Sequence, residues 1–425
     1  MKLLRVPTPV VCAVVAAAAV LSIGGVTSDD GLFVSDTSAQ TVGGEIKIAL
    51  LSDFEHKGVF EYAVSEYNRE QASITSSNYQ ITSKVVDVPL GNSSIITYIQ
   101  DLEREGFKYF IGPLASSSAE AAKAYTDTTN DLVLLSPSST AASLAIEGDS
   151  LFRLVPSDDA QVPIIMDRIQ SQGKEHVVLI YRDDTWGVGL HDIITRDYAG
   201  AVAHTILLSP DGSNAAAVAT EAATQVDRLV SSHGADKVAV LLLSFDTDTV
   251  ALVQNIISNA ALASTLDDVK WYGGDGTAEQ RELVDDRDVA AFLSSVDFVS
   301  SKFEVVPNPV NLKIGAQAFG DDATYGDNLY DAVFLLADTV IINDEELAEG
   351  VSGSTVRSLV LDVAAGLRDH DHRHSERTVG DGALGAYELN AAGDMSSPLT
   401  FELFKIFENS NGSFEWRIIK ANVCR

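Results

Sequence analysis

Short apolar runs alternate with amphipathic segments along the chain from Gly44 onward. The run EIKIALLS at 45–52 predicts a strand, and the spacing of apolar positions at 59–68 predicts a helix. The same order repeats, with further strands predicted at 79–90, 107–114, 131–139, 175–184, 203–210, 237–245, 269–276 and 296–301. Helices are predicted between them, including 95–106, 116–125 and 250–264. Strands that alternate with helices indicate an α/β fold with parallel sheets covered on both faces. The length favours two lobes over a single sheet.

Polar residues gather where the predicted strands end. The stretch FIGPLASSSAEAAKAY at 110–125 passes from an apolar run through Gly-Pro into three serines and a helical segment. Ser117 and Glu120 have the spacing of a capping box. Ser116 then lies beside a helix N-terminus, where backbone donors favour an anion. Ligands of parallel α/β sheets bind beyond the carboxyl ends of the strands, so these loops are candidate site edges.

Composition narrows the classes of partner. The chain has 425 residues, of which 46% are hydrophobic, and 61 acidic against 29 basic residues give a formal net charge of −32. Such a surface repels phosphate backbones and anionic lipid, so nucleic acid is not an expected partner. Cys12 and Cys424 are the two cysteines, and Cys12 falls in the leader, so no internal disulfide framework is expected.

The N-terminal segment has the layout of a secretory signal. Lys2 and Arg5 precede an apolar run that ends in small residues, followed by polar TSDDG. Residues 1–28 are therefore predicted to be a signal peptide or a retained N-terminal anchor, since the run is of marginal length for a membrane span. Residues 29–44 are predicted to be a flexible tether. The protein is expected to be exported, in the periplasm or at the cell surface.

Seven segments in order resemble the type I periplasmic binding proteins. They are FIGPLASSSA, LLSPSST, LFRLVPSDDAQ, VVLIYRDDTWGVGL, VAVLLLSFDTD, WYGGDG and LYDAVFLLADTV. The resemblance runs from Glu45 to the C-terminus, and is nearest to the branched-chain amino-acid, amide and urea binding proteins of ABC transporters. The glycine-rich loop that this family has after its first strand is not matched, because LLSDFEHKGVF at 50–60 is short and charged.

The resemblance implies two α/β lobes joined by three crossing strands, with a ligand held between them. Residues 45–161 and 301–379 are expected to form lobe one, and 162–300 and 380–425 to form lobe two. It also implies delivery of a small polar ligand to the permease of an ABC transporter. A sensory ectodomain of the same fold is the alternative, and the sequence leaves the ligand open among amino acids, amides and urea.

The resemblance also carries over a set of ligand-binding positions. On lobe one it implies that the ligand carboxylate is bound by hydroxyls and backbone N–H groups, and on lobe two that Asp275 binds the ammonium. Asp275 in its glycine-flanked turn can equally be read as a turn former, and Trp186 as a core residue. The implied ligand-binding residues are Ser116, Ser138, Thr140, Asp158, Trp186, Phe245 and Asp275.

Enzyme and metal motifs are not found. The chain has no phosphate-binding loop of the Walker type, no H-E-x-x-H and no G-x-S-x-G elbow, so neither catalysis nor a cofactor is expected. The adjacent acids Asp183 and Asp184 are interpreted as solvated or helix-capping residues. The run DHDHRH at 369–374 is interpreted as an exposed loop in preference to a metal site. Sequons are present at Asn92 and Asn411, and whether they are glycosylated depends on the compartment.

Overall fold

The computed structural model describes residues 43–52, 56–74, 78–88, 94–129, 131–317, 325–348, 350, 355–365, 382–397 and 399–424. The predicted leader and most of the tether (1–42), the sequon at Asn92 and the run 369–374 lie outside the described residues. Within the described ranges no single helix is long and apolar enough to cross a membrane. Helices α7 (Asp246–Ile257) and α8 (Ala260–Asp267) meet that criterion only together, as a pair bent by 110°.

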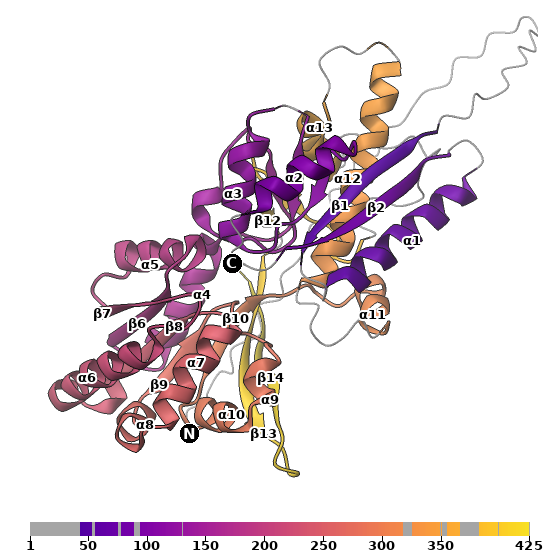
Figure 1. Cartoon of the computed structure of the whole chain (residues 1–425). Helices are drawn as coiled ribbons and strands as arrows, with labels where there is room; N and C mark the ends of the chain where they lie inside the picture. Colours follow the sequence, from indigo (N-terminus) through magenta and orange to yellow (C-terminus); the bar gives the residue numbers. More distant parts are fainter. Residues whose placement is uncertain are drawn as a thin grey trace, which may run out of the picture.

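The first lobe is built on five parallel strands in the order β2-β1-β3-β4-β5 (Figure 1). These are β1 (Glu45–Ser52), β2 (Gln80–Asp87), β3 (Tyr109–Ile111), β4 (Val133–Ser136) and β5 (Leu151–Arg153). Successive side chains of a strand face opposite sides. Ile48 and Leu50 of β1 therefore pack on one face, and Ala49 and Leu51 on the other. The helices on the two faces are α1 (Lys57–Ser73), α12 (Gly326–Ala348) and α13 (Val356–Ala364) on the first, and α2 (Ile95–Arg104) and α3 (Ser116–Thr126) on the second.

The second lobe is built on seven strands in the order β14-β13-β10-β9-β8-β6-β7. The strands are β6 (His176–Arg182), β7 (Val202–Leu208), β8 (Val238–Leu243), β9 (Lys270–Gly273), β10 (Val299–Phe303), β13 (Thr400–Glu408) and β14 (Phe414–Cys424). The five from β7 to β10 are parallel, whereas β13 pairs antiparallel with β10, with Val299 opposite Lys405. The helices that accompany this sheet are α4 (Asp158–Ser171), α5 (Thr185–Asp197), α6 (Ala215–His233), α7, α8, α9 (Glu282–Asp285) and α10 (Arg287–Ser295).

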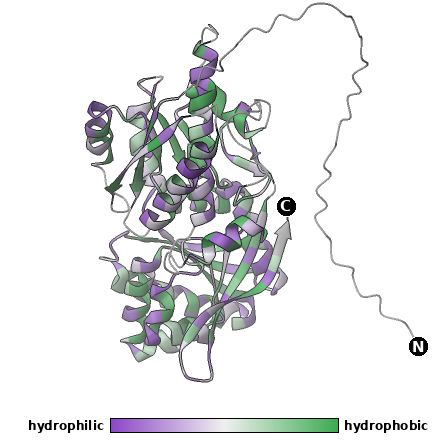
Figure 2. Ribbon diagram, turned by 90° about the vertical axis from the view of Figure 1, so that its right-hand side faces the viewer, coloured by the Kyte–Doolittle hydropathy of each residue, from purple (hydrophilic) through white to green (hydrophobic). Residues whose placement is uncertain are grey.

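The chain passes between the sheets three times: between β5 and α4, between β10 and α11 (Pro309–Gly315), and between β12 (Met395–Ser397) and β13. Strand β12 pairs with β11 (Glu388–Leu389) in a two-stranded sheet beside β5. In both lobes the helices carry hydrophilic positions beside hydrophobic ones (Figure 2). Such helices cover a sheet with one face and meet solvent with the other.

The predicted α/β fold with two sheet-based lobes is confirmed, and the nine predicted strands correspond to β1 to β4 and β6 to β10. The short strand β5 and the hairpin of β13 and β14 were not predicted. Two observations bear on the lobe boundaries, which remain a proposal. Residues 301–303 belong to β10 in the second sheet, and Ala383, Leu384 and Asp394 bond to residues of the first lobe.

Candidate functional site

A cavity of about 280 Å³ lies between the lobes at the carboxyl ends of β3, β4, β6, β8 and β9. Its walls contain six of the seven predicted ligand-binding residues: Ser116, Ser138, Thr140, Trp186, Phe245 and Asp275. Asp158 is the seventh, and it is buried next to Thr140 and Asp275. Parallel sheets place the loops after their strands at one edge, which is why residues far apart in sequence meet here.

The first wall contains the N-terminus of α3. This helix begins at Ser116 with Ala115 at the N-cap, and no side chain caps it, so the predicted capping box of Ser117 and Glu120 is wrong. The N-cap lies two residues earlier than this box requires, and the Glu120 carboxylate instead accepts a hydrogen bond from the Thr185 hydroxyl of α5 at 2.6 Å. The Ser116 hydroxyl accepts from the Ala141 N–H at 3.2 Å. A serine hydroxyl that accepts in this way can still donate its hydrogen.

The same wall contains the loop that follows β4, residues 137–141. The Ser136 hydroxyl anchors it, because it donates to the Pro113 carbonyl at 2.7 Å and accepts from the Ser139 N–H at 3.1 Å. The Ser138 hydroxyl donates to the Leu114 carbonyl at 3.0 Å. These bonds join the loops after β3 and β4, so both loops present their donors to one cavity.

The second wall carries the carboxylate of Asp275, which is 7% exposed. Tyr325, which precedes α12 in the first lobe, donates to its Oδ2 at 3.0 Å. Among the described residues, Asp275 Oδ1 and both carboxylate oxygens of Asp158 have no hydrogen-bond partner. Buried oxygens without partners are costly unless a proton, a cation or a donor reaches them. This corner of the cavity therefore favours a positively charged group.

The two carboxyl groups also affect each other's protonation. Burial and the charge of Asp275 raise the pKa of Asp158 well above its ordinary value, against the opposing effects of the nearby Thr140 hydroxyl and the charge of Arg153. Burial likewise raises the pKa of Asp275, and the nearby polar side chains of Gln161 and Tyr325 lower it in part. Two like charges at one buried place favour the neutral form, so an empty cavity favours retention of a proton.

Aromatic rings form the remaining wall on the second lobe. The rings of Trp186 and Phe245 have centroids 4.9 Å apart, and the Arg182 guanidinium lies 4.3 Å from the Phe245 centroid. Arg182 is paired with Asp248 at 2.5 Å and with Asp184 at 2.6 Å. Burial raises the pKa of Asp248 to about 6 in spite of Arg182. Asp184 caps α5 by accepting from the Gly187 N–H, as interpreted from the sequence.

A larger cavity of about 700 Å³ adjoins the first one and shares Glu279, Arg281 and Tyr325 with it. Its lining includes the buried Lys302, which is paired with Glu279 and Glu304, each at 2.6 Å. None of the seven predicted residues lines it. The smaller cavity is therefore the candidate site, because a helix N-terminus, hydroxyls and buried carboxylates meet there.

Two residues near the site were missed by sequence reasoning. Arg153 is fully buried behind the loop after β4, and a lone basic residue in the apolar run LFRLV was an available signal. Tyr325 bonds to Asp275, but nothing in its surrounding sequence distinguished it. In the described part of the chain no group of three or more His, Cys, Asp or Glu side chains could hold a metal ion.

Two lobes with a polar cavity between them define a ligand-binding protein of the bilobed class. The family model described as the receptor family ligand binding region matches residues 55–341, more than half of the chain, and the protein belongs to this family. The chain is also similar to an uncharacterized protein of Methanocaldococcus jannaschii, with 24% identity over 402 residues, which are 88% of this chain and 92% of that protein.

Solved structures show the same type I periplasmic binding fold, as predicted. A leucine-binding protein of Thermotoga maritima matches with a TM-score of 0.63 at 14% identity, over 89% of this chain and 98% of its own. A branched-chain amino acid transporter substrate-binding protein of Streptococcus pneumoniae, in complex with isoleucine, gives 0.63 at 18% identity, over 90% and 100%. A solute-binding protein of R. palustris in complex with benzoate gives 0.61 at 13% identity, over 90% and 98%.

Proposed function

We propose that this protein captures a small amino acid between its lobes and delivers it to an ABC transporter. The observation that carries the proposal is the division of the cavity into two chemically different walls. One wall offers hydroxyls and a helix N-terminus, which attract a carboxylate. The other offers buried carboxylate oxygens without partners, which attract an ammonium.

The size of the cavity is consistent with this ligand class. About 280 Å³ lies just below the roughly 300–1,000 Å³ of pockets for drug-sized ligands. Leucine, isoleucine and benzoate, the ligands named for the similar structures, all carry a carboxylate, and the two amino acids also carry an ammonium. All three ligands thus share a carboxylate. Because the partnerless oxygens of Asp275 and Asp158 favour an ammonium, we expect this protein to bind an amino acid in preference to benzoate.

A thermal-shift screen of residues 29–425 against amino acids, their amides, urea and benzoate tests the proposal. A ligand at one hundred times its Kd stabilises the fold by about 2.7 kcal/mol, which raises the unfolding temperature measurably. We expect stabilisation by one or more amino acids and none by urea. A shift with benzoate that no amino acid produces would contradict the assignment of the second wall.

Delivery and export need separate tests. Transport predicts that removal of the protein from its host abolishes uptake of the radiolabelled amino acid found in the screen. Unchanged uptake would favour the alternative, a sensory ectodomain, which the receptor description of the family makes the second candidate. Export predicts that cell fractionation finds the protein outside the cytoplasm, whether the segment 1–28 is cleaved or kept as an anchor.

A further inference from the structure

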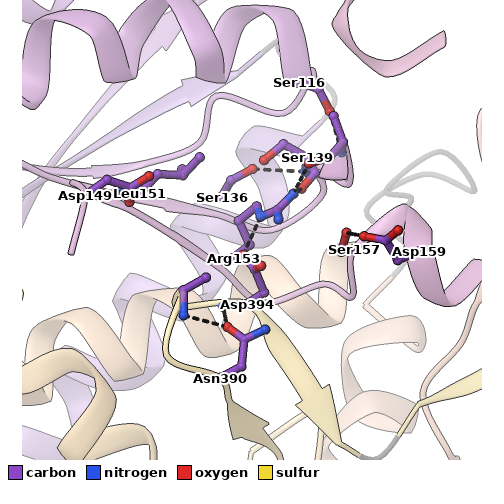
Figure 3. Close-up of polar contacts among 12 residues, drawn as sticks. Ser116, Ser136, Ser139, Asp149, Leu151, Arg153, Ser157, Asp159, Asn390 and Asp394 are labelled. Carbon is purple, nitrogen blue, oxygen red and sulfur yellow. Dashed lines mark hydrogen bonds and ion pairs between the residues drawn. The ribbon is translucent and has the colours of Figure 1, made fainter. Parts of the chain in front are cut away.

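A buried ion pair joins the back of the site to the third crossing between the lobes. Arg153, at the end of β5, is 0% exposed, and Asp394, just before β12, is 1% exposed. The Arg153 Nε lies 2.6 Å from Asp394 Oδ1 (Figure 3). Buried ion pairs often add little stability over apolar replacements, so the position of this pair calls for another role.

The other side of the guanidinium holds the loop after β4. Arg153 Nη1 donates to the carbonyl of Ser139 at 3.0 Å and to the carbonyl of Ala141 at 2.8 Å. In a planar trans peptide the carbonyl and the following N–H point in opposite directions. The bond from Arg153 to the Ser139 carbonyl therefore turns the Thr140 N–H away from Arg153.

Two further backbone groups of this loop have partners among the described residues, whereas the Ser139 hydroxyl is buried without one. The Thr140 carbonyl accepts from the Asp158 N–H at 2.9 Å, and the Ala141 N–H donates to the Ser116 hydroxyl. The Thr140 N–H makes no hydrogen bond with any residue that the structure describes, and Thr140 lines the cavity. It is thus a backbone donor left for an anionic group.

Asp394 itself is held by a tight turn. The Asn390 side-chain oxygen accepts from the N–H groups of Ala392 at 2.9 Å and Asp394 at 3.0 Å (Figure 3), and the Arg153 N–H donates to the Gly393 carbonyl at 2.8 Å. The chain continues from this turn into β12 and then crosses to β13. The ion pair therefore connects the loop at the cavity with the crossing segment.

We propose that Arg153 and Asp394 are positioning residues that orient the Ser139–Ala141 loop for an anionic ligand group and tie that orientation to the third crossing. The identity of the ligand in this inference rests on the proposed function, whereas the orientation of the loop does not. Arg153→Lys keeps a positive charge but has a single ammonium in place of the planar guanidinium, whose Nε holds Asp394 while its Nη1 holds the two carbonyls. Asp394→Asn keeps the size and removes the charge that fixes the guanidinium.

Asp149→Asn is the matched control. Asp149 lies just before β5, is 9% exposed and pairs with Lys123 at 3.3 Å, and its Oδ1 accepts from the Leu151 N–H. It is thus a second largely buried acid of the first lobe, and none of these partners belongs to the loop. A general loss of stability should therefore affect the control as it affects the two variants.

The experiment has two arms on the protein without its leader. Hydrogen exchange of the ligand-free protein, followed by mass spectrometry, reports on peptides covering residues 137–144. Calorimetry then measures the affinity for L-leucine and for L-leucinamide, which lacks the carboxylate. We expect faster exchange of the loop in both variants and not in the control. We also expect about a tenfold or larger loss of affinity for leucine, with a much smaller loss for leucinamide, since only the carboxylate uses the Thr140 N–H.

The outcomes separate this inference from the proposed function. Unchanged loop exchange in Arg153→Lys and Asp394→Asn overturns the inference, and so do equal losses for leucine and leucinamide. If Arg153→Lys does not fold, the exchange and affinity measurements on Asp394→Asn alone test the inference. If the wild type binds neither probe, leucine is not its ligand, and the calorimetry is repeated with the amino acid found in the screen and its amide. If no amino acid binds, the amino-acid assignment is at fault, and the exchange arm still decides whether the pair orients the loop.

Discussion

At the scale of single residues, the site consists of groups that have only part of their bonding capacity in use. The Ser116 hydroxyl accepts one hydrogen bond and has a hydrogen to donate, and Asp275 uses one of its two oxygens. Such residues are mostly satisfied in a protein interior. Among the described residues, the three carboxylate oxygens of Asp158 and Asp275 that lack partners meet at this one cavity.

The carboxylate wall leads to the first prediction. Ser116→Ala and Thr140→Ala should each weaken binding of an amino acid by about 1.5–3 kcal/mol, the value of a hydrogen bond to a charged group. Calorimetry measures the affinity, and thermal unfolding checks the fold. Ser118→Ala is the control, because Ser118 is buried in the same turn of α3 and does not line the cavity. If both variants bind the amino acid with wild-type affinity, this wall does not bind the ligand carboxylate.

Asp275 is predicted to select for the ammonium. Asp275→Asn should reduce affinity for an amino acid several-fold or more, because a buried ammonium loses its charged partner. A ligand without an ammonium should be affected much less, since the asparagine still forms hydrogen bonds. Asp183→Asn, an exposed acid after β6, serves as the control. If the wild type and Asp275→Asn bind an amino acid equally well, Asp275 does not bind the ammonium and is only a turn residue.

The pair of buried carboxyl groups predicts a dependence on pH. The folded protein holds protons on Asp158 and Asp275 above the ordinary carboxyl pKa of 3.8, whereas the unfolded chain has released them. The free energy of unfolding of the empty protein should therefore fall as pH rises from that value to the raised pKa. Binding of an ammonium should strengthen over the same range, because both carboxylates become charged.

Asp158→Asn tests this directly, since it removes one titrating group. The unfolding temperature of the empty variant, measured from pH 4 to 8, should depend less on pH than that of the wild type. Asp159→Asn, its exposed neighbour, should retain the wild-type dependence. Identical profiles for wild type and Asp158→Asn would show that other groups, such as Asp248 with a pKa of about 6, set the response.

At the scale of elements, the turn after β9 determines how closely the second wall can approach the cavity. A Cβ on Gly276 would lie 2.6 Å from Phe245 Cδ1 and 2.6 Å from the Ser244 carbonyl oxygen. Gly276→Ala should therefore displace Phe245 and cost about 1–3 kcal/mol of stability, as overpacking does. It should also weaken ligand binding. Gly200→Ala, where a Cβ meets nothing within 4 Å, should leave both unfolding temperature and affinity unchanged.

The elements also show what the sequence could predict. The buried parallel strands were evident because both faces are covered, so each is a continuous apolar run such as VAVLLL of β8. The hairpin of β13 and β14 was missed, although residues 414–418 of β14 alternate apolar and charged side chains as a half-buried strand does. The pattern breaks at Ile418 and Ile419, so it covers only part of the strand. Strand β5 has three residues, too few for any periodicity.

The site was predictable only in part, for a related reason. Ser116, Thr140 and Asp275 follow predicted strands, so topology alone brings them to one edge. Arg153 and Asp394 meet through a contact between residues 241 positions apart, and Tyr325 reaches Asp275 from the other lobe. Such contacts depend on how the two lobes and the crossings are arranged, which no local pattern encodes.

At the scale of the whole molecule, the lobes touch each other across the cavity. Thr185 of α5 bonds to Glu120 of α3, and Tyr325 bonds to Asp275. A ligand that contacts both walls stabilises this arrangement over any more open one. We expect small-angle X-ray scattering to show a smaller radius of gyration with the ligand than without it. Thr185→Val should reduce that difference, and an unchanged radius on binding would argue against closure.

The path of the chain through the two sheets also constrains the order of folding. Strand β10 lies between β9, which precedes it closely, and β13, which follows only after α11, α12, α13 and the β11–β12 hairpin have been made (Figure 1). During synthesis one edge of the second sheet must therefore wait with β10 unpaired on one side. Unpaired strand edges attract other chains, and pairings distant in sequence form slowly. Pairing of β13 with β10 is therefore expected among the last steps of folding, after the elements of the first lobe have been made.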